Sequence, residues 1–151
     1  MKSILIALLL VVTIHSVQAQ SKEKDLPMAI DTLIKNNYPK AEDLEWSKAH
    51  SNTYNAVVYN IHFYVNERVV SMEMTAEGLV LAKETELGIK DLPRSLQYFI
   101  QQHKIKFAAL VEYHDDKPVY VLETVYKGQS HFSVFNTNGT LIHTKKNFSL
   151  F

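Results

Sequence analysis

A helix-opening phrase that occurs twice is the feature that most constrains this sequence of 151 residues. Asp25-Leu26-Pro27 and Asp91-Leu92-Pro93 are the same three letters, 66 positions apart. Proline presets φ for a first helical turn, and an aspartate just upstream can cap the free amides at the positive end of the helix dipole. Apolar residues three and four positions apart follow each phrase. Each phrase therefore predicts a short amphipathic helix that must pack against another element.

Strand-like segments follow both predicted helices, so the element they cover is a sheet. We predict helices over residues 27–37 and 93–103, the first ending before Pro39 because the residue ahead of a proline avoids the helical region. The predicted strands cover residues 44–49, 54–65, 68–75, 79–85, 107–114, 119–126, 130–135 and 140–145. The fold predicted is α+β, with tandem repeats at 20–86 and 87–151. Each repeat would be a helix followed by a four-stranded antiparallel sheet, the two sheets lying side by side with the helices on one face.

The first central hairpin has a register that its turn predicts. If Asn66-Glu67 is a two-residue loop, one face of the hairpin is apolar and the other is mixed. The apolar pairs are Tyr59 with Met74, Ile61 with Met72 and Phe63 with Val70. The mixed pairs are Asn60 with Glu73, His62 with Ser71 and Tyr64 with Val69. We expect the apolar face to lie beneath the helix and the mixed face to be open.

The second central hairpin is less determined. Tyr54 precedes Tyr120 by 66 positions, whereas Met74 precedes Phe135 by 61. An odd difference reverses the alternation of side chains, so we predict a three-residue loop or a bulge near Gly128. Two sets of residues remain alternatives for the core of this half: Tyr120, Leu122 and Tyr126, or Val119, Val121 and Val125.

The first 19 residues are typical of a secretory signal peptide. Lys2 precedes an apolar run over 4–14, and Val17-Gln18-Ala19 has the small residues of a cleavage site. The run is shorter than the roughly 20 residues that a bilayer requires, and no later stretch is long or apolar enough to span one. We therefore expect a mature chain that begins at Gln20 and is periplasmic or extracellular.

Composition excludes several classes of function. There is no cysteine, which rules out disulfides, thiolate metal sites and a cysteine nucleophile. Without the leader the chain has 15 basic and 16 acidic side chains, so it lacks the basic patch expected of a nucleic-acid-binding protein. The four glycines form no phosphate-binding loop.

The polar residues do not form a catalytic or metal motif. The six histidines after the leader never occur as His-x-His or His-x-x-x-His, so we predict no metal and no cofactor. Three strand glutamates, Glu73, Glu112 and Glu123, are candidates for acid/base chemistry, but glutamates on an open strand face are usually solvated. For Glu123, which lies among valines, the other interpretation is a core conflict relieved by a bulge. The prediction is therefore no catalytic residue and no enzyme activity, with a hydrolase as the third and weakest class.

Several motifs together resemble the PepSY-like family of small secreted bacterial proteins, which is related in fold to the β-lactamase inhibitor protein (BLIP). They are Leu26-Pro27-x-x-Ile30, Tyr38-Pro39-x-Ala41, the strand residue Tyr54, Met74-Thr75-x-x-Gly78 and the second copy of the pattern. The second copy departs from it at Lys104-Ile105, where the first has Tyr38-Pro39. The resemblance implies a concave sheet surface that binds or inhibits exported proteins, and no catalytic residue.

Aromatic residues on the strands are the positive functional signal, because large rigid rings anchor protein interfaces. The predicted contact residues are Trp46, Tyr54, His62, Tyr64, Tyr113, Tyr120, Tyr126 and Phe132. We expect an exported protein as the partner, and inhibition of an exported enzyme is one form of this function. The alternative is a periplasmic carrier or sensor of a small apolar ligand held between sheet and helices. A cavity lined by Phe63, Met72 and Met74 would favour the carrier, and a filled core would favour protein binding.

Overall fold

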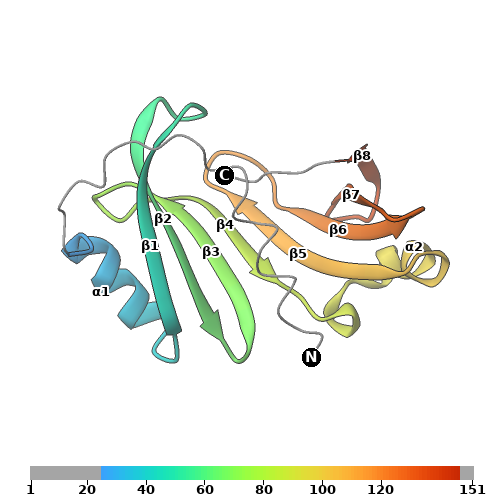
Figure 1. Cartoon of the computed structure of the whole chain (residues 1–151), viewed down its shortest axis with the longest axis horizontal. Coiled ribbons are helices and arrows are strands. Elements are labelled where there is room, and N and C mark those ends of the chain that lie inside the picture. Colours follow the sequence, from blue (N-terminus) through green and yellow to red (C-terminus); the bar gives the residue numbers. More distant parts are fainter. Residues whose placement is uncertain (1–24, 147–151) are drawn as a thin grey trace.

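The computed structural model describes residues 25–146, in which eight antiparallel strands pair in chain order to form one sheet (Figure 1). The strands are β1 (Glu42–Ser51), β2 (Ala56–Val65), β3 (Arg68–Met74), β4 (Val80–Glu86), β5 (Ile105–Tyr113), β6 (Val119–Tyr126), β7 (Gln129–Asn136) and β8 (Leu141–Lys145). The signal peptide and its cleavage site lie outside the described residues.

The predicted fold class is wrong. We expected two repeats, each a helix and a four-stranded sheet, with the two sheets side by side, but β4 is hydrogen-bonded to β5, with Glu84 opposite Val111 and Glu86 opposite Ala109. The sheet is therefore continuous across the middle of the chain. The α-helices are short, 10 and 6 residues, so the protein is mostly β. The division at residues 86 and 87 stays a prediction.

Helix α1 (Met28–Asn37) closely matches the prediction. It ends before Tyr38 and Pro39, as expected from the restriction that proline places on the preceding residue. Its start differs in one respect. Pro27 occupies the N-cap position, and no side chain caps the helix, so Asp25 does not have the predicted capping role. The Ile30 and Asp31 amides both donate to the Pro27 carbonyl, at 3.0 and 3.1 Å.

The second helical segment is shorter and tighter than predicted. Two 3₁₀ turns, η1 (Ile89–Asp91) and η2 (Arg94–Leu96), precede α2 (Gln97–Gln102). Pro93 therefore opens a 3₁₀ turn where we expected the α-helix itself. Asp91 does not cap it, because its carboxylate accepts from the Arg68 guanidinium at 2.6 Å.

The β2–β3 hairpin confirms the predicted register at every pair. Tyr59 lies opposite Met74, and Val65 closes the hairpin opposite Arg68. Asn66 and Glu67 have φ of 51° and 65°, which is the left-handed geometry of a type I′ turn. The twist of this turn matches the twist of the strands, so two residues are enough to set which side chains share a face.

The β6–β7 hairpin contradicts the prediction of a bulge near Gly128. Tyr126 pairs directly with Gln129 across a two-residue turn of Lys127 and Gly128, with φ of 49° and 76°. Our alignment of Tyr54 with Tyr120 caused the error.

Strand pairing gives the correct correspondence. Tyr120 pairs with Phe135, just as Tyr59 pairs with Met74, so Tyr59 is the counterpart of Tyr120. The extra five residues lie before β2, and neither hairpin changes its alternation.

Both helices pack on the same face of the sheet, which we call the helix face. Ile34 of α1 shares a hydrophobic cluster with Met72, and the strand register continues this face from Met72 to Glu112. Because side chains alternate along a strand, Ala108 lies on the face of Glu112, and it clusters with Leu96 beside α2. Figure 1 shows the two helices near opposite ends of the sheet.

Each of the two alternatives for the second core is correct in part, because Tyr126 and Val125 are exposed and the other residues divide between the two faces. Tyr120 and Leu122 belong to the cluster at α2. Val121 joins Val111 and Val134 in a smaller cluster on the opposite face.

Candidate functional site

The face of the sheet that carries neither helix is the candidate site, and we call it the open face. Its side chains follow from the strand register. Across β1 to β5 they include Glu45, Asn60, His62, Tyr64, Ser71, Glu73, Ala82, Glu84, Glu86, Val111 and Tyr113. One row of cross-strand neighbours runs Glu45, His62, Ser71, Glu84 and Val111. This row connects polar groups from four neighbouring strands, β1 to β4, and ends at the apolar Val111 on β5.

The predicted contact residues do not all lie on this face. His62, Tyr64, Tyr113 and Phe132 are on it, and Tyr54 lies in the turn between β1 and β2. Trp46 is on the helix face, where its ring is 5.9 Å from that of Tyr59. Tyr120 is also on the helix face, and Tyr126 follows it by alternation at the exposed end of β6. The structure therefore brings together about half of the predicted set.

His62 and Ser71 form the polar centre of the first hairpin. His62 Nδ1 lies 2.9 Å from Ser71 Oγ, across the pair that the turn predicted. Burial lowers the pKa of His62, and the charge of Glu45 on the neighbouring strand opposes part of this effect. A neutral imidazole beside a hydroxyl makes a hydrogen-bonding surface rather than a cationic one.

Glu84 is the most perturbed group on the open face. Burial, followed by the nearby charge of Glu86, raises its pKa to about 7. Glu86 itself accepts a hydrogen bond from the Val69 amide at 3.1 Å. We did not single out Glu84 from the sequence. The alternation Ala82, Glu84 and Glu86 within one strand was the available signal, because it places two carboxylates on the same face.

Asn60 and Glu73 place two hydrogen-bond acceptors side by side on the open face. They are direct cross-strand partners. Glu73 is only 6% exposed as a whole residue, so it is more buried than the solvated glutamate that we expected. Asn60 Oδ1 is buried and has no hydrogen-bond partner. Such a buried acceptor costs about 1–3 kcal/mol when it is left unpaired.

Two tyrosines border this group of acceptors. Tyr54 donates its hydroxyl to the Leu81 carbonyl at 3.1 Å, which fixes the turn between β1 and β2 against β4. Burial raises the pKa of Tyr54, and the charges of Glu73 and Asp115 add to it. Burial also raises the pKa of Tyr113, with smaller contributions from its neighbours, including Glu84. Both phenols therefore remain neutral donors at physiological pH.

The far end of the open face has a different character. Glu123 is 8% exposed there and accepts hydrogen bonds from Lys106 Nζ at 2.9 Å and from Ser130 Oγ. The β5–β6 register shifts between Ile105 and Phe107, which leaves Lys106 as the extra residue of a bulge. The predicted conflict at Glu123 is thus relieved by a bulge, whose lysine compensates the charge.

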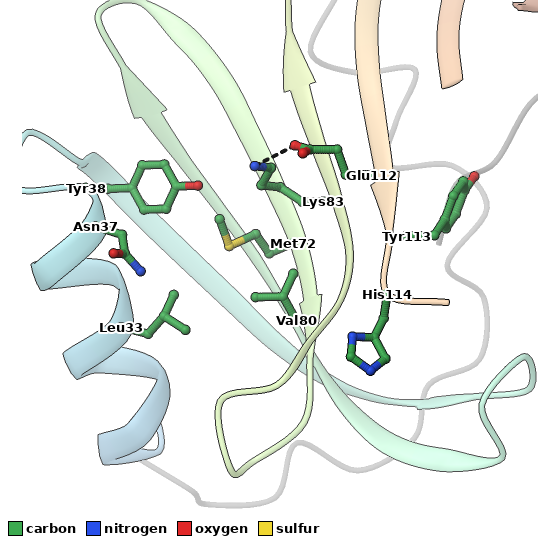
Figure 2. A pocket seen from close by; sticks show the side chains of 9 residues that line it. All are labelled: Leu33, Asn37, Tyr38, Met72, Val80, Lys83, Glu112, Tyr113 and His114. Atoms are coloured by element: carbon green, nitrogen blue, oxygen red, sulfur yellow. Dashed lines mark ion pairs between the residues drawn. The ribbon is translucent and has the colours of Figure 1, made fainter. Parts of the chain in front are cut away.

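A shallow depression of about 270 Å³ lies on the helix face beside α1 (Figure 2). Leu33, Met72 and Val80 form its apolar part. Lys83 and Glu112 form an ion pair at its rim, and Figure 2 shows the Tyr38 ring pointing toward Lys83. Phe63, Met72 and Met74 are at most 2% exposed and fill the core, instead of enclosing a ligand cavity.

No three histidine or acidic side chains gather as a metal site among residues 25–146. Within the same range, no helix is long and apolar enough to cross a membrane.

Comparison with known proteins shows the fold. No family model matches the sequence, and no curated protein matches it. Solved structures do match. A BLIP-like protein from Bacteroides fragilis is 23% identical, with a TM-score of 0.62 over 82% of this chain and 89% of that one. The protein therefore has the BLIP-like fold.

Two other solved structures share this fold. A DUF2874 family protein from Bacteroides ovatus is 17% identical, with a TM-score of 0.64 over 80% of this chain and 87% of that one. A protein from Bacteroides eggerthii that is thought to be periplasmic is 14% identical, with a TM-score of 0.66 over 80% of this chain and 88% of that one. These likenesses support the predicted similarity in fold to BLIP, and they do not bear on the PepSY-like family in particular.

Proposed function

We propose that this protein is an exported, non-enzymatic module that binds another exported protein through the open face of its sheet. The observation that carries the proposal is the position of His62 and Tyr64, two exposed ring-bearing side chains on a face that neither α1 nor α2 covers. Tyr64 is 44% exposed. An aromatic ring with a polar tip is a frequent interface anchor.

The solved neighbours give further support. One is BLIP-like and another is thought to be periplasmic, which agrees with the leader predicted from residues 1–19. We propose His62, Tyr64, Tyr113 and Phe132 as contact residues, with Tyr54 as the residue that holds the adjacent turn in place. Trp46, Tyr120 and Tyr126 stay predictions, and their placement on the helix face disfavours them.

The filled core favours protein binding over the carrier alternative. Phe63, Met72 and Met74 were the residues that a carrier would use to line a cavity, and they are packed against Ile30 and Ile34. Inhibition of an exported enzyme is the form of binding that we propose first, because a module without catalytic groups can act by covering another protein's active site.

The test is a pull-down from periplasmic extract with the chain from Gln20 onward. We expect a His62→Ala, Tyr64→Ala double variant to lose the captured protein. The matched control is Tyr98→Ala, since Tyr98 is 74% exposed but lies on α2. Circular dichroism establishes that each variant is folded. Capture that is lost with Tyr98→Ala and kept by the double variant would contradict the proposal. If the captured protein is an enzyme, its activity with and without this protein tests inhibition.

A further inference from the structure

The open face lacks positive charge where it is most acidic. Its strands β1 to β4 carry Glu45, Glu73, Glu84 and Glu86, and the described residues on that part of the face include no lysine or arginine. The nearby lysine on β4, Lys83, points to the helix face and pairs with Glu112. No lysine or arginine among the described residues of this part of the face therefore neutralises these four glutamates. Charge complementarity across an interface would require a cation from the partner.

Glu73 and Asn60 point to a missing donor. Glu73 is only 6% exposed as a whole residue, and among residues 25–146 it has no ion pair that would neutralise its charge. Asn60 Oδ1, from the neighbouring strand, is buried without a hydrogen bond. These are two separate acceptors, one charged and one neutral, on adjacent positions of the same face.

Glu84 completes the group. It lies diagonally across the β3–β4 pairing from Glu73, since Glu73 faces Ala82 and Ser71 faces Glu84. Diagonal neighbours of this kind have Cβ atoms about 7–8 Å apart, a separation that one planar cation can bridge by contacting both carboxylates. We call Asn60, Glu73 and Glu84 the acceptor cluster.

We infer that the acceptor cluster receives an arginine side chain of the exported partner. The inference rests on the proposed function and names the chemistry of its partner. A guanidinium has five N–H donors in a fixed plane and can serve two carboxylates and an amide carbonyl at once. A lysine ammonium has three donors around one point and satisfies a spread group of acceptors less well. Hydrogen bonds to charged groups are also the strong ones in partly buried sites.

The groups facing Glu84 set how this site responds to protons. They are Glu73 and Ser71 on β3, with His62 behind Ser71 on β2, Glu86 on the same strand, and Tyr113 on β5. None is a cation at neutral pH, because the pKa of His62 is lowered from an ordinary value already below 7. A bound guanidinium would be the first positive charge beside Glu84, so it should lower the pKa of that carboxyl.

The test is an NMR titration of the mature chain with the peptide acetyl-Gly-Arg-Gly-amide. The neutral control peptide carries citrulline, which has nearly the same shape without the charge. Glu84→Gln and Glu73→Gln remove one carboxylate each. Glu77→Gln removes one in the exposed turn after β3 and is the matched protein control.

We expect amide shifts on β2 to β4 with the arginine peptide and none with the citrulline peptide. Binding should weaken about tenfold in Glu84→Gln and in Glu73→Gln, and stay within twofold in Glu77→Gln. In the wild-type chain the peptide should lower the pKa of the Glu84 carboxyl group by about one unit, as followed by the chemical shift of its carboxyl carbon. This last measurement needs no variant, so it decides the question even if Glu73→Gln does not fold.

Equal shifts with citrulline, equal weakening in Glu77→Gln, or an unchanged pKa of Glu84 would overturn the inference. The pull-down distinguishes this failure from failure of the proposed function. If capture still depends on Tyr64 and the arginine peptide does not bind, the open face is an interface without an arginine site. If the peptide binds but no open-face variant changes capture, the proposed function fails.

Discussion

Lys106 Nζ lies 2.9 Å from Oε1 of Glu123, and the bulge at the start of β5 makes this contact possible. Glu123 is nearly buried on the open face, whereas the side chain of Lys106 is 46% exposed. The lysine therefore supplies charge to a site that water can hardly reach. In a regular strand the side chain of Lys106 would point to the face opposite Phe107 and Glu123, and it could not reach this carboxylate.

We predict that Lys106→Met destabilises the protein by about 1–3 kcal/mol, because it leaves a buried carboxylate with Ser130 as its remaining donor. Urea unfolding measures the change. Adding Glu123→Gln should restore most of the loss, since a neutral amide requires no counter-charge. Lys35→Met is the control: it breaks the exposed Lys35–Asp31 pair, which should cost about 0.3–0.5 kcal/mol. Equal losses in the two single variants would contradict this account.

Gly139 and Gly128 should respond differently to the same substitution. Both have positive φ, so alanine is strained at each. A Cβ on Gly139 would lie 2.5 Å from Cβ of Ser95, whereas a Cβ on Gly128 would meet no atom within 4 Å. We expect Gly128→Ala to cost about 1 kcal/mol from backbone strain and Gly139→Ala clearly more.

Thermal and urea unfolding of the two alanine variants compare these costs. Combining Gly139→Ala with Ser95→Gly should recover part of the loss, because it removes the side-chain atoms nearest to the new methyl group. Indistinguishable stabilities of Gly128→Ala and Gly139→Ala would show that the turn after β7 does not pack against η2.

Glu67→Gly should stabilise the protein by about 0.5–1 kcal/mol. Glu67 has φ of 65° in the two-residue turn between β2 and β3, and Asn-Gly is the preferred sequence for this turn type. Glu77→Gly is the comparison, because Glu77 does not have positive φ and glycine there should lower stability through backbone entropy. The midpoint of urea unfolding should move in opposite directions for the two variants. A lower midpoint for Glu67→Gly would mean that the turn is not type I′.

Glu84 makes stability fall as pH rises from about 4.5 to about 7. Its pKa is raised to about 7 in the folded chain, so the folded state holds a proton that the unfolded state has already released. The contribution is fully present below pH 4.5 and is lost as pH rises through 7. Its size is roughly 3 kcal/mol. His62 has the opposite effect on stability. Its pKa is lowered from 6.5 in the folded chain, so its contribution makes stability rise as pH increases toward 6.5.

The effect of Glu84 is isolated by comparing wild type with Glu84→Gln at pH 5 and pH 8. His62 is present in both chains, so its contribution cancels in the difference. From pH 5 to pH 8, we expect the free energy of unfolding of Glu84→Gln to rise by about 2 kcal/mol relative to that of the wild type. Urea unfolding measures both chains. A difference that is the same at both pH values would rule out a carboxyl that is neutral in the folded state.

The sequence alone determined what depends on neighbouring residues. Helix α1 ends before Tyr38 because Pro39 acts on the residue beside it. The β2–β3 register follows from a two-residue turn and strict alternation, so every pair from Tyr59 to Val65 was correct. The strand bounds were close to those observed for the same reason.

The tertiary structure decided what depends on distant contacts. The pairing of Glu84 with Val111 joins the sheet at its centre, and no local pattern distinguishes that pairing from two free edges. Trp46 and Tyr64 are aromatic residues on neighbouring strands with alternating side chains. Trp46 nevertheless packs against the core on the helix face, whereas Tyr64 is exposed on the open face. The burial of Glu73 and the unpaired Asn60 Oδ1 also arise only when three strands meet. Alternation assigns two residues to the same face or to opposite faces, but packing across the whole sheet decides which face is covered and which acceptors are left without a donor.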